Sequence, residues 1–435
     1  MCGVTKKANL ATSLKKMKNQ YPIDFGFYPK TWIVPHQMAK LKSDIAKVKN
    51  KDGVAPMMIV KPSESSQGKG IFFINDVEKL KDQLQADREK KNISSTSYVV
   101  QKYIPNPYLL DGLKFDLRLY VLVTSCHPLT IFWHKEGIAR FATQQYTMAK
   151  GKNSMPEHAH LTNYAINKDA ADFKISESDI EAGTSSKRTL ETVYKRLAED
   201  GVDVSLLKLK IADLIIKTLI SVQPDLLHSY RTCQPNDRTF DMCFEVLGFD
   251  VLIDADTKPW LLEVNQAPSF QTDSPLDYKV KKAVIRDTFT ILGVTESNRQ
   301  KNLDRIIRDR ELKKMHKQST LFWNQMRGEE FAREIDERRV HQLNNLGGFY
   351  KVFPVEDQDQ SLSGGLFRNS ISKKAKSYYA KFEKNGNMSV AGQTGHGLLQ
   401  NIIKQKKHHH NRSGGPDHQN SGQVVQASNQ VLPSP

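Results

Sequence analysis

Two segments of the chain, Glu245-Val-Leu-Gly-Phe-Asp-Val-Leu-Ile-Asp254 and Trp260-Leu-Leu-Glu-Val-Asn265, decide the fold. Both are apolar enough for buried strands, and the intervening Asp254-Ala-Asp-Thr-Lys-Pro259 has the residues of a turn. A hairpin centred on that turn places Asp250 directly opposite Glu263. Opposed residues have Cβ atoms roughly 5 Å apart, and two like charges at that distance destabilise a sheet.

The acidic pair therefore predicts a cation between the two strands. Asn265 follows Glu263 by two residues, so both side chains point to the same face of the strand. Two carboxylates and one amide oxygen make a hard, open oxygen site, which suits Mg²⁺ that also carries phosphates. The alternative is a solvent-facing hairpin whose acids stay hydrated, and the hydrophobicity of both strands argues against it.

Length and composition limit the class of protein. A chain of 435 residues can hold two or three domains and bury a large core. The formal net charge of +16 favours an anionic partner, such as nucleic acid, a membrane surface or an acidic protein. The four cysteines form no CxxC pair, which indicates reduced thiols and a cytoplasmic protein. No apolar run reaches the roughly 20 residues of a membrane helix, so we expect no contact with membranes.

Residues 21–292 mix strand and helix patterns, which predicts an α+β fold. The patterns predict strands at residues 56–61, 70–75, 98–104, 114–124 and 129–134, and helices at 76–90 and 204–222. Within 114–124, the alternate residues Phe115, Leu117, Leu119 and Val121 are expected to face inward. Lys114, Asp116 and Arg118 share the opposite face.

The composition changes near residue 298. Residues 299–340 are rich in Lys, Arg and Glu and predict one or two long helices, most basic over 299–317. Most such charged runs are solvated helices held by salt bridges. From about residue 357 onward, polar and basic residues dominate, and a segment of this composition cannot bury a core.

A basic, glycine-containing loop, Lys61-Pro-Ser-Glu-Ser-Ser-Gln-Gly-Lys-Gly70, joins two expected strands. Its backbone N–H groups can close over phosphates, with Lys61 and Lys69 supplying positive charge. It has neither the Walker A spacing nor the dinucleotide-binding fingerprint, and alone it would be taken for a hairpin turn. Its place ahead of a short strand and the acidic hairpin resembles the order of an ATP-grasp enzyme.

Longer motifs make this resemblance specific. They are Lys114-Phe-Asp-Leu-Arg118, His160-Leu-Thr-Asn-Tyr-Ala-Ile-Asn167, His228-Ser-Tyr-Arg-Thr232 and Trp260-Leu-Leu-Glu-Val-Asn-Gln-Ala-Pro-Ser269. Together they closely resemble the tubulin tyrosine ligase-like family, whose members join a carboxylate to an amine through an acyl-phosphate. Cys243-Phe-Glu-Val-Leu-Gly-Phe-Asp250 and Asn345-Leu-Gly-Gly-Phe-Tyr-Lys-Val-Phe-Pro354 are similar to the glutamylating branch, and the resemblance covers about Pro29 to Pro354.

The resemblance implies an ATP-grasp fold and four regions. Residues 1–60 would be the remnant of an N-terminal subdomain that the family usually has in longer form. Residues 61–298 would form the catalytic core, in which two α+β subdomains enclose ATP. Residues 299–354 would be a cationic helical region that binds microtubules, and residues 355–435 a disordered tail.

The resemblance also assigns roles to individual residues. ATP would be bound by Lys61, Gln67, Gly68, Gln101, Lys102, Tyr103, Ile104, Lys114, Phe115, Asp116, Thr162 and Asn163. Asp250, Glu263 and Asn265 match the Mg²⁺ ligands, in agreement with the hairpin argument. Free L-glutamate would be bound by Arg140, Tyr164, Lys187 and Lys281, since cations suit a dicarboxylate. Arg118 and Glu263 are expected to be catalytic, with Arg118 steadying the acyl-phosphate.

Gln67 together with His228 is similar to members that elongate glutamyl chains, which places both residues on the acceptor side. The implied function is that of a monomeric, ATP- and Mg²⁺-dependent tubulin polyglutamylase at cytoskeletal microtubules, including those of the cilium, flagellar axoneme and basal body. Its acceptors would be the acidic C-terminal tails of tubulin.

Three alternatives remain. A glycine ligase would share the ATP site, but Arg140, Lys187 and Lys281 would have no side-chain carboxylate to bind. A catalytically silent microtubule-binding protein would have no need of all three metal ligands. A nucleic-acid binder would explain the charge, but the chain has no zinc-finger spacing and no RNP motif, so we expect no nucleic acid.

Overall fold

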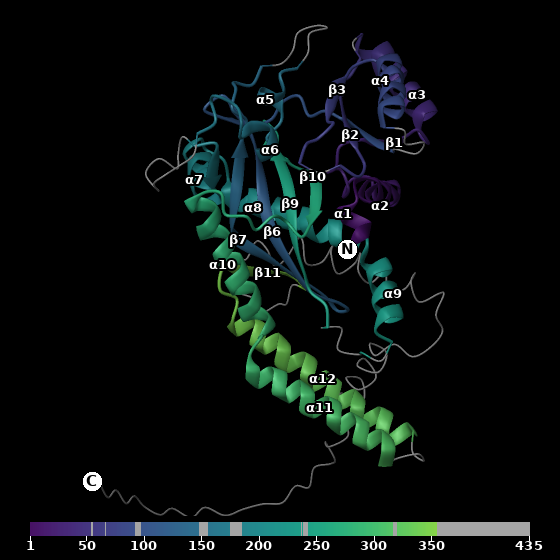
Figure 1. The fold of residues 1–435 in the computed structure, drawn as a ribbon, viewed down its shortest axis with the longest axis vertical. Helices are drawn as coiled ribbons and strands as arrows, with labels where there is room; N and C mark the ends of the chain where they lie inside the picture. The colour runs from purple at the N-terminus through teal and green to yellow at the C-terminus, as the bar shows by residue number, and fades with distance from the viewer. Residues whose placement is uncertain are drawn as a thin grey trace, which may run out of the picture.

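The computed structural model describes residues 1–53, 55–65, 67–91, 97–147, 155–174, 185–235, 237, 242–315 and 320–354. Helices and two antiparallel sheets are mixed along the chain, as Figure 1 shows, so the α+β prediction is confirmed. The tail predicted to be disordered, residues 355–435, lies outside the described residues.

The helices are α1 Cys2–Thr5, α2 Lys7–Gln20, α3 Met38–Asp52, α4 Val77–Lys91, α5 Glu157–His160, α6 Tyr164–Asn167, α7 Leu190–Glu199, α8 Val204–Ile220, α9 Gln223–Cys233, α10 Pro275–Leu292, α11 Glu296–Met315 and α12 Thr320–Asn344. The strands are β1 Thr31–Val34, β2 Met58–Pro62, β3 Phe72–Ile74, β4 Tyr98–Lys102, β5 Leu109–Leu110, β6 Leu113–Cys126, β7 Leu129–Phe141, β8 Lys187–Thr189, β9 Glu245–Ile253, β10 Pro259–Gln266 and β11 Phe349–Phe353. Each strand and helix predicted between residues 56 and 222 is present, although β7 continues well past the expected end at residue 134.

The smaller sheet has the strand order β1-β4-β2-β3. Helices α3 and α4 pack on it through a core that includes Trp32, Leu41, Val60 and Leu80. Because β1 pairs with β4 and β4 with β2, the predicted boundary between residues 60 and 61 would divide one sheet, and it is wrong. Residues from about 31 onward belong with this sheet.

The larger sheet has the order β10-β9-β6-β7-β11, with β5 paired to β6 and β8 to β7. One face of this sheet packs against α7 and α8. The core between them contains Phe115, Leu117, Leu119 and Val121, as the alternation of apolar and polar residues in 114–124 predicts. Helix α10 covers part of the other face, where Val284 and neighbouring residues contact the sheet. The N-terminal helices α1 and α2 also pack into the main core.

The two long helices predicted after residue 298 are α11 and α12, and Figure 1 shows them extending away from the sheets. The predicted region 299–354 groups these two helices with residues 345–354. In the structure, residues 345–354 do not extend away from the sheets with the helices. The chain returns after α12, and β11 pairs with β7 inside the larger sheet. Among the described helices, none combines the length and hydrophobicity needed to cross a bilayer.

A buried junction holds β11 against the sheet and α10. The Asp287 carboxylate on α10 accepts a hydrogen bond from the Gly348 amide at 2.7 Å and lies 3.2 Å from Nε2 of His134 on β7. Arg286 donates to its other oxygen at 2.8 Å. A Cβ at Gly348 would lie 2.5 Å from the His134 ring, so glycine is required for this close approach.

The junction predicts that the protein loses stability as the pH falls. Burial lowers the pKa of His134 below its ordinary value of 6.5, outweighing Asp287. Burial would raise the pKa of Asp287, but Arg286, the Gly348 amide and His134 lower it below its ordinary value of 3.8. A folded-state pKa below the unfolded value gives stability that is lost on acidification, so the free energy of unfolding should decline below pH 6.5.

The slope from one such histidine can approach about 1.4 kcal/mol per pH unit. Urea unfolding between pH 7 and 5 should show this slope in the wild type and a smaller one in His134→Gln. His36→Gln is the control, because His36 is exposed. An unchanged slope in His134→Gln would contradict the assignment.

Candidate functional site

The β9–β10 hairpin forms with the predicted register, and Asp250 pairs with Glu263. The pairing shifts by one residue between Leu261 and Glu263, so Leu262 falls at a bulge, and its side chain lines the neighbouring cavity. Bulges are common beside functional sites because they redirect a side chain.

The turn between the two strands is held by one aspartate. The Asp254 carboxylate accepts hydrogen bonds from the amides of Asp256 and Lys258, at 3.1 and 2.9 Å. Its second oxygen accepts from the Trp260 indole at 2.7 Å. These contacts fix the ends of the hairpin and therefore the register of the acidic pair.

The three predicted metal ligands converge at one point. The Asn265 amide nitrogen lies 3.2 Å from Oδ2 of Asp250 and 3.3 Å from Oε1 of Glu263. Within the described residues, no group of three or more His, Cys, Asp or Glu side chains could hold a metal ion, so a cation here would rely on the Asn265 amide beside the two carboxylates. The donor set fits a hard cation such as Mg²⁺ that leaves positions open for phosphates.

A buried charge network surrounds Asp250. Arg118 donates to both its carboxylate oxygens, the NH2–Oδ2 bond being 3.0 Å, and Arg140 approaches Oδ2 at 2.9 Å. Arg140 also forms a bidentate pair with Asp116. Burial would raise the pKa of Asp250, but the two guanidinium groups hold it well below its ordinary value. Asp250 is therefore ionised at neutral pH.

This network follows from strand register. Arg118 on β6 is opposite Asp250 on β9, which is opposite Glu263 on β10. In the next row, Asp116 is opposite Arg140 on β7, which is opposite Lys187 on β8. Each row therefore holds one pair of opposite charges and one pair of like charges, which is Asp250 with Glu263 in the first row and Arg140 with Lys187 in the second.

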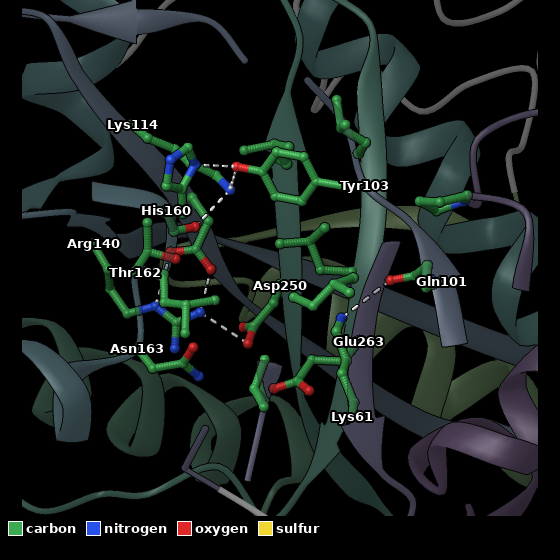
Figure 2. A pocket seen from close by; sticks show the side chains of 18 of the residues that line it. Lys61, Gln101, Tyr103, Lys114, Arg140, His160, Thr162, Asn163, Asp250 and Glu263 are labelled. Atoms are coloured by element: carbon green, nitrogen blue, oxygen red, sulfur yellow. Dashed lines mark hydrogen bonds and ion pairs between the residues drawn. The ribbon is translucent and has the colours of Figure 1, made fainter. Parts of the chain in front are cut away.

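A central cavity of about 670 Å³ lies between the two sheets. Figure 2 shows Lys114, His160 and Arg140 on one side of it and Tyr103, Gln101 and Lys61 on the other, with Asp250 between them. Most residues predicted to bind ATP line it, namely Lys61, Gln101, Lys102, Tyr103, Ile104, Lys114, Asp116, Thr162 and Asn163. Its apolar walls were not predicted and come from Ile59, Ile71, Leu161, Leu252 and Leu262.

Lys61 is buried at one end of this cavity. Its Nζ donates to Oε1 of Gln101 at 3.1 Å, and the Gln101 amide donates in turn to Thr31 Oγ1 at 3.1 Å. Burial lowers the pKa of Lys61, although Glu263 and other nearby acids oppose this shift. The amide that orients Lys61 is neutral, so the ammonium charge remains available to an anion.

Lys114 is buried in a similar way. It donates to the Tyr103 hydroxyl at 3.0 Å and to the His160 carbonyl at 2.7 Å. Burial lowers the pKa of Lys114 to about 7, and burial with the Lys114 charge lowers the pKa of His160 to about 4. His160 is thus a neutral structural histidine that contacts Tyr103 at 2.8 Å. An anionic ligand would stabilise the charged form of Lys114.

In the hinge at residues 101–104, two backbone amides already form hydrogen bonds within the protein. The Lys102 amide donates to the Lys30 carbonyl at 2.8 Å, and the Tyr103 amide donates to the Met57 carbonyl at 3.0 Å. Backbone bonds to an adenine therefore require other groups of the hinge.

Two of the four residues predicted to bind glutamate share an acid that was not predicted. Asp277 on α10 pairs with Lys187 at 2.6 Å and with Lys281 at 2.9 Å. Burial would raise the pKa of Asp277, but these two lysines lower it. Lys187 also lies 3.8 Å from the centre of the Tyr164 ring, and both line a small cavity of about 290 Å³. The only sequence signal for Asp277 is its position four residues before Lys281.

Several other predicted residues do not line the central cavity, and Asn265 is among them. The Phe115 side chain is 1% exposed and stacks on Phe141 in the core, so it faces away from Lys114 and does not line the central cavity. Arg118 binds Asp250 and is absent from the cavity wall. Gln67 and Gly68 line a neighbouring cavity.

His228, predicted to lie on the acceptor side, is on α9. It is exposed, its carbonyl accepts a hydrogen bond from Thr232, and it lines neither of these two cavities.

Residues 2–302 match the model of the tubulin-tyrosine ligase family. The chain belongs to this family. Its α+β architecture is the ATP-grasp-like fold of the family, as predicted. The match ends within α11, so it includes both sheets except β11.

Several curated relatives are similar over most of the chain. A probable beta-tubulin polyglutamylase of Tetrahymena thermophila is 38% identical over 359 residues, which are 82% of this chain and 29% of the relative. The human tubulin polyglutamylase TTLL6 is 36% identical over 88% of this chain and 41% of its own length. The human tubulin polyglutamylase TTLL7 is 33% identical over 87% and 44%. The chain thus spans less than half the length of these relatives.

The network predicts that Asp250 is needed for stability and Glu263 is not. Asp250→Ala leaves the buried Arg118 guanidinium without its carboxylate, and breaking a buried pair costs about 3–5 kcal/mol. Glu263→Gln removes one of two opposed charges and should change stability by less than about 1 kcal/mol. Urea unfolding measures both variants, and equal stabilities would contradict the role of Asp250.

Proposed function

We propose that this chain is an ATP-dependent ligase that adds glutamate to glutamyl side chains of acidic tubulin tails. The observation that carries the proposal is that the acidic hairpin and two buried lysines line one cavity. In the described part of the chain neither Lys61 nor Lys114 has an ion-pair partner, so both can bind phosphate oxygens. The relatives named tubulin polyglutamylases supply the substrate class.

ATP would occupy the central cavity, with its base between apolar walls near Tyr103 and Ile104 and its phosphates toward Lys61. Asp250, Glu263 and Asn265 would hold Mg²⁺, which offsets phosphate charge when bound. Arg118 and Arg140 keep Asp250 ionised and in place, so we assign Arg118 a positioning role through Asp250.

The reaction would proceed in two steps. A side-chain carboxylate of the acceptor attacks the γ-phosphorus of ATP, which forms an acyl-phosphate and releases ADP. The amine of free glutamate then attacks the acyl carbon, phosphate leaves with the bonding electron pair, and the amine proton passes to a base. Lys61 stabilises charge on the transferred group by its position at the phosphate end.

The free glutamate would be bound by Arg140, Tyr164, Lys187 and Lys281. Lys187 and Lys281 share the single charge of Asp277, so one positive charge remains for the side-chain carboxylate of the substrate. Glycine offers no such carboxylate, and a glycine ligase is therefore the second candidate rather than the first.

Microtubule binding would use α11. Over residues 299–317 the chain has eight Lys or Arg against three Asp or Glu, and such a segment suits the acidic surface of a microtubule. We extend the proposal to a monomeric protein at cytoskeletal microtubules, including those of the cilium, axoneme and basal body.

The test is mass spectrometry of tubulin and of glutamylated tail peptides after incubation with Mg-ATP and glutamate, glycine or tyrosine in separate reactions. We expect mass increments with glutamate alone. Increments with glycine would favour the second candidate. No increment with any of the three, from folded protein that binds ATP, would contradict ligase activity.

In this assay Glu263→Gln should abolish ligation while the protein stays folded. Glu263 has no ion-pair partner among the described residues, so it is the acid most available to a metal ion. Glu78→Gln is the matched control, since Glu78 lies on the surface of α4 in exposed ion pairs. Undiminished ligation by Glu263→Gln would exclude the metal assignment.

Gln67 is predicted to favour elongation over branch initiation. It lines the N-terminal side of the site in the β2–β3 loop and adopts φ of 59°, which is uncommon outside glycine. Gln67→Arg should increase the share of single-glutamate branches on unmodified tail peptides and reduce chain length. Mass spectra with the same length distribution as the wild type would refute this.

A further inference from the structure

A second cavity, of about 1080 Å³, opens beside the central one. The two cavities share wall residues, among them Lys61, Asn163 and Glu263. The second cavity is otherwise enclosed by the β2–β3 loop, the end of β10 and the N-terminal helices, which contribute Lys6 and Lys7. We call it the N-terminal cavity.

Cations dominate its wall. Lys6, Lys7, Lys61 and Lys69 line it, against two acids, Glu64 and Glu263, which leaves a net charge of +2. Within the described residues, Lys6, Lys7 and Lys69 have no carboxylate within ion-pair distance. A cavity with unpaired cations is suited to a ligand with several carboxylates.

Lys7 occupies a fixed place in this wall. Its ammonium group donates to the Ser65 carbonyl in the β2–β3 loop at 2.6 Å, across 58 residues of sequence. It is also near enough to Lys61 that its charge adds to burial in lowering the pKa of Lys61, against Glu263. Lys7 therefore borders the phosphate end of the central cavity.

The position of the N-terminal cavity relative to the expected ATP and glutamate sites indicates which substrate would occupy it. The base of ATP would lie toward Tyr103, and the free glutamate toward Lys187 and its small cavity. The acceptor must reach the terminal phosphate from a third side. The N-terminal cavity opens onto Lys61 and Glu263 from that side, and Gln67, already placed with the acceptor, lies in its wall.

We infer that the N-terminal cavity binds the acceptor as a polyanionic glutamyl chain, with Lys6 and Lys7 contacting carboxylates next to the reacting one. The inference rests on the proposed function and adds the acceptor subsite to it. It also explains why a segment before residue 31 reaches the site: Lys6, which joins α1 to α2, and Lys7, the first residue of α2, bring two cations to the edge of the central cavity.

The experiment compares two peptides. One has a branch of three glutamates, and in the other the two non-reacting branch glutamates are replaced by glutamine. Lys7→Gln should raise KM for the acidic peptide roughly tenfold, since charge-assisted hydrogen bonds are lost. KM for ATP and for glutamate should stay within about twofold of the wild type. With the glutamine peptide, wild type and variant should differ little, because the coupled partner is absent.

Lys16→Gln is the matched control, because Lys16 is an exposed lysine of the same helix. A rise in KM for both peptides alike would mean that Lys7 only supports the loop at Ser65, and a rise in KM for ATP would make it a nucleotide residue. Either result overturns the inference.

Fluorescence anisotropy of the labelled peptides separates this inference from the proposed function, because it needs no turnover. Tighter binding of the acidic peptide by wild type than by Lys7→Gln supports the acceptor subsite even where no glutamate is added. Equal binding by both proteins overturns it even where ligation occurs.

Discussion

The buried pairing of Asp250 with Arg118 and Arg140 is the interaction on which the site depends. Three acids, Asp116, Asp250 and Glu263, lie near two arginines on one side of the larger sheet, and the arginines form ion pairs with only two of these acids. The arginines take Asp116 and Asp250. Glu263 is the acid that remains, and it lies where the hairpin borders both cavities. The two arginines therefore neutralise the buried carboxylates of Asp116 and Asp250, and the Glu263 carboxylate is left available to a cation.

The lysines of the smaller sheet and of β6 give the opposite imbalance. Lys61 and Lys114 are 8% and 6% exposed, and their partners are an amide, a hydroxyl and a carbonyl. Burying ammonium groups without acids costs stability. A polyanion with bound cations, such as a metal nucleotide, would satisfy the lysines and the spare acid together. Lys61 comes from the smaller sheet, whereas Lys114, Asp250 and Glu263 come from the larger one, and the folded chain brings these complementary charges to one cavity.

What could be predicted from sequence was local. The register of Asp250 with Glu263 follows from turn residues and a period of two, and neither needs knowledge of distant contacts. The same alternation places the side chain of Phe115 in the core, on the other face of β6 from Lys114. Lys7 was missed because its partner is 58 residues away, and Asp277 because its contact with Lys187 spans 90 residues, which its local spacing from Lys281 does not indicate. The predicted domain boundary at residue 60 divides the smaller sheet, because no local sequence pattern indicates that β1 pairs with β4.

These contacts also change the expected physical basis for selecting free glutamate over glycine as the substrate. A count of cations predicts strong attraction for a dicarboxylate, but Arg140 is committed to two aspartates and the two lysines share Asp277. Attraction alone is then modest. Lys187 is held between Asp277 and the face of Tyr164, so its ammonium group is already oriented before a substrate arrives. Selectivity for glutamate would thus come less from the number of positive charges than from the fixed position of the Lys187 ammonium group. A glutamate whose side-chain carboxylate binds this group would have its amine directed toward the phosphate.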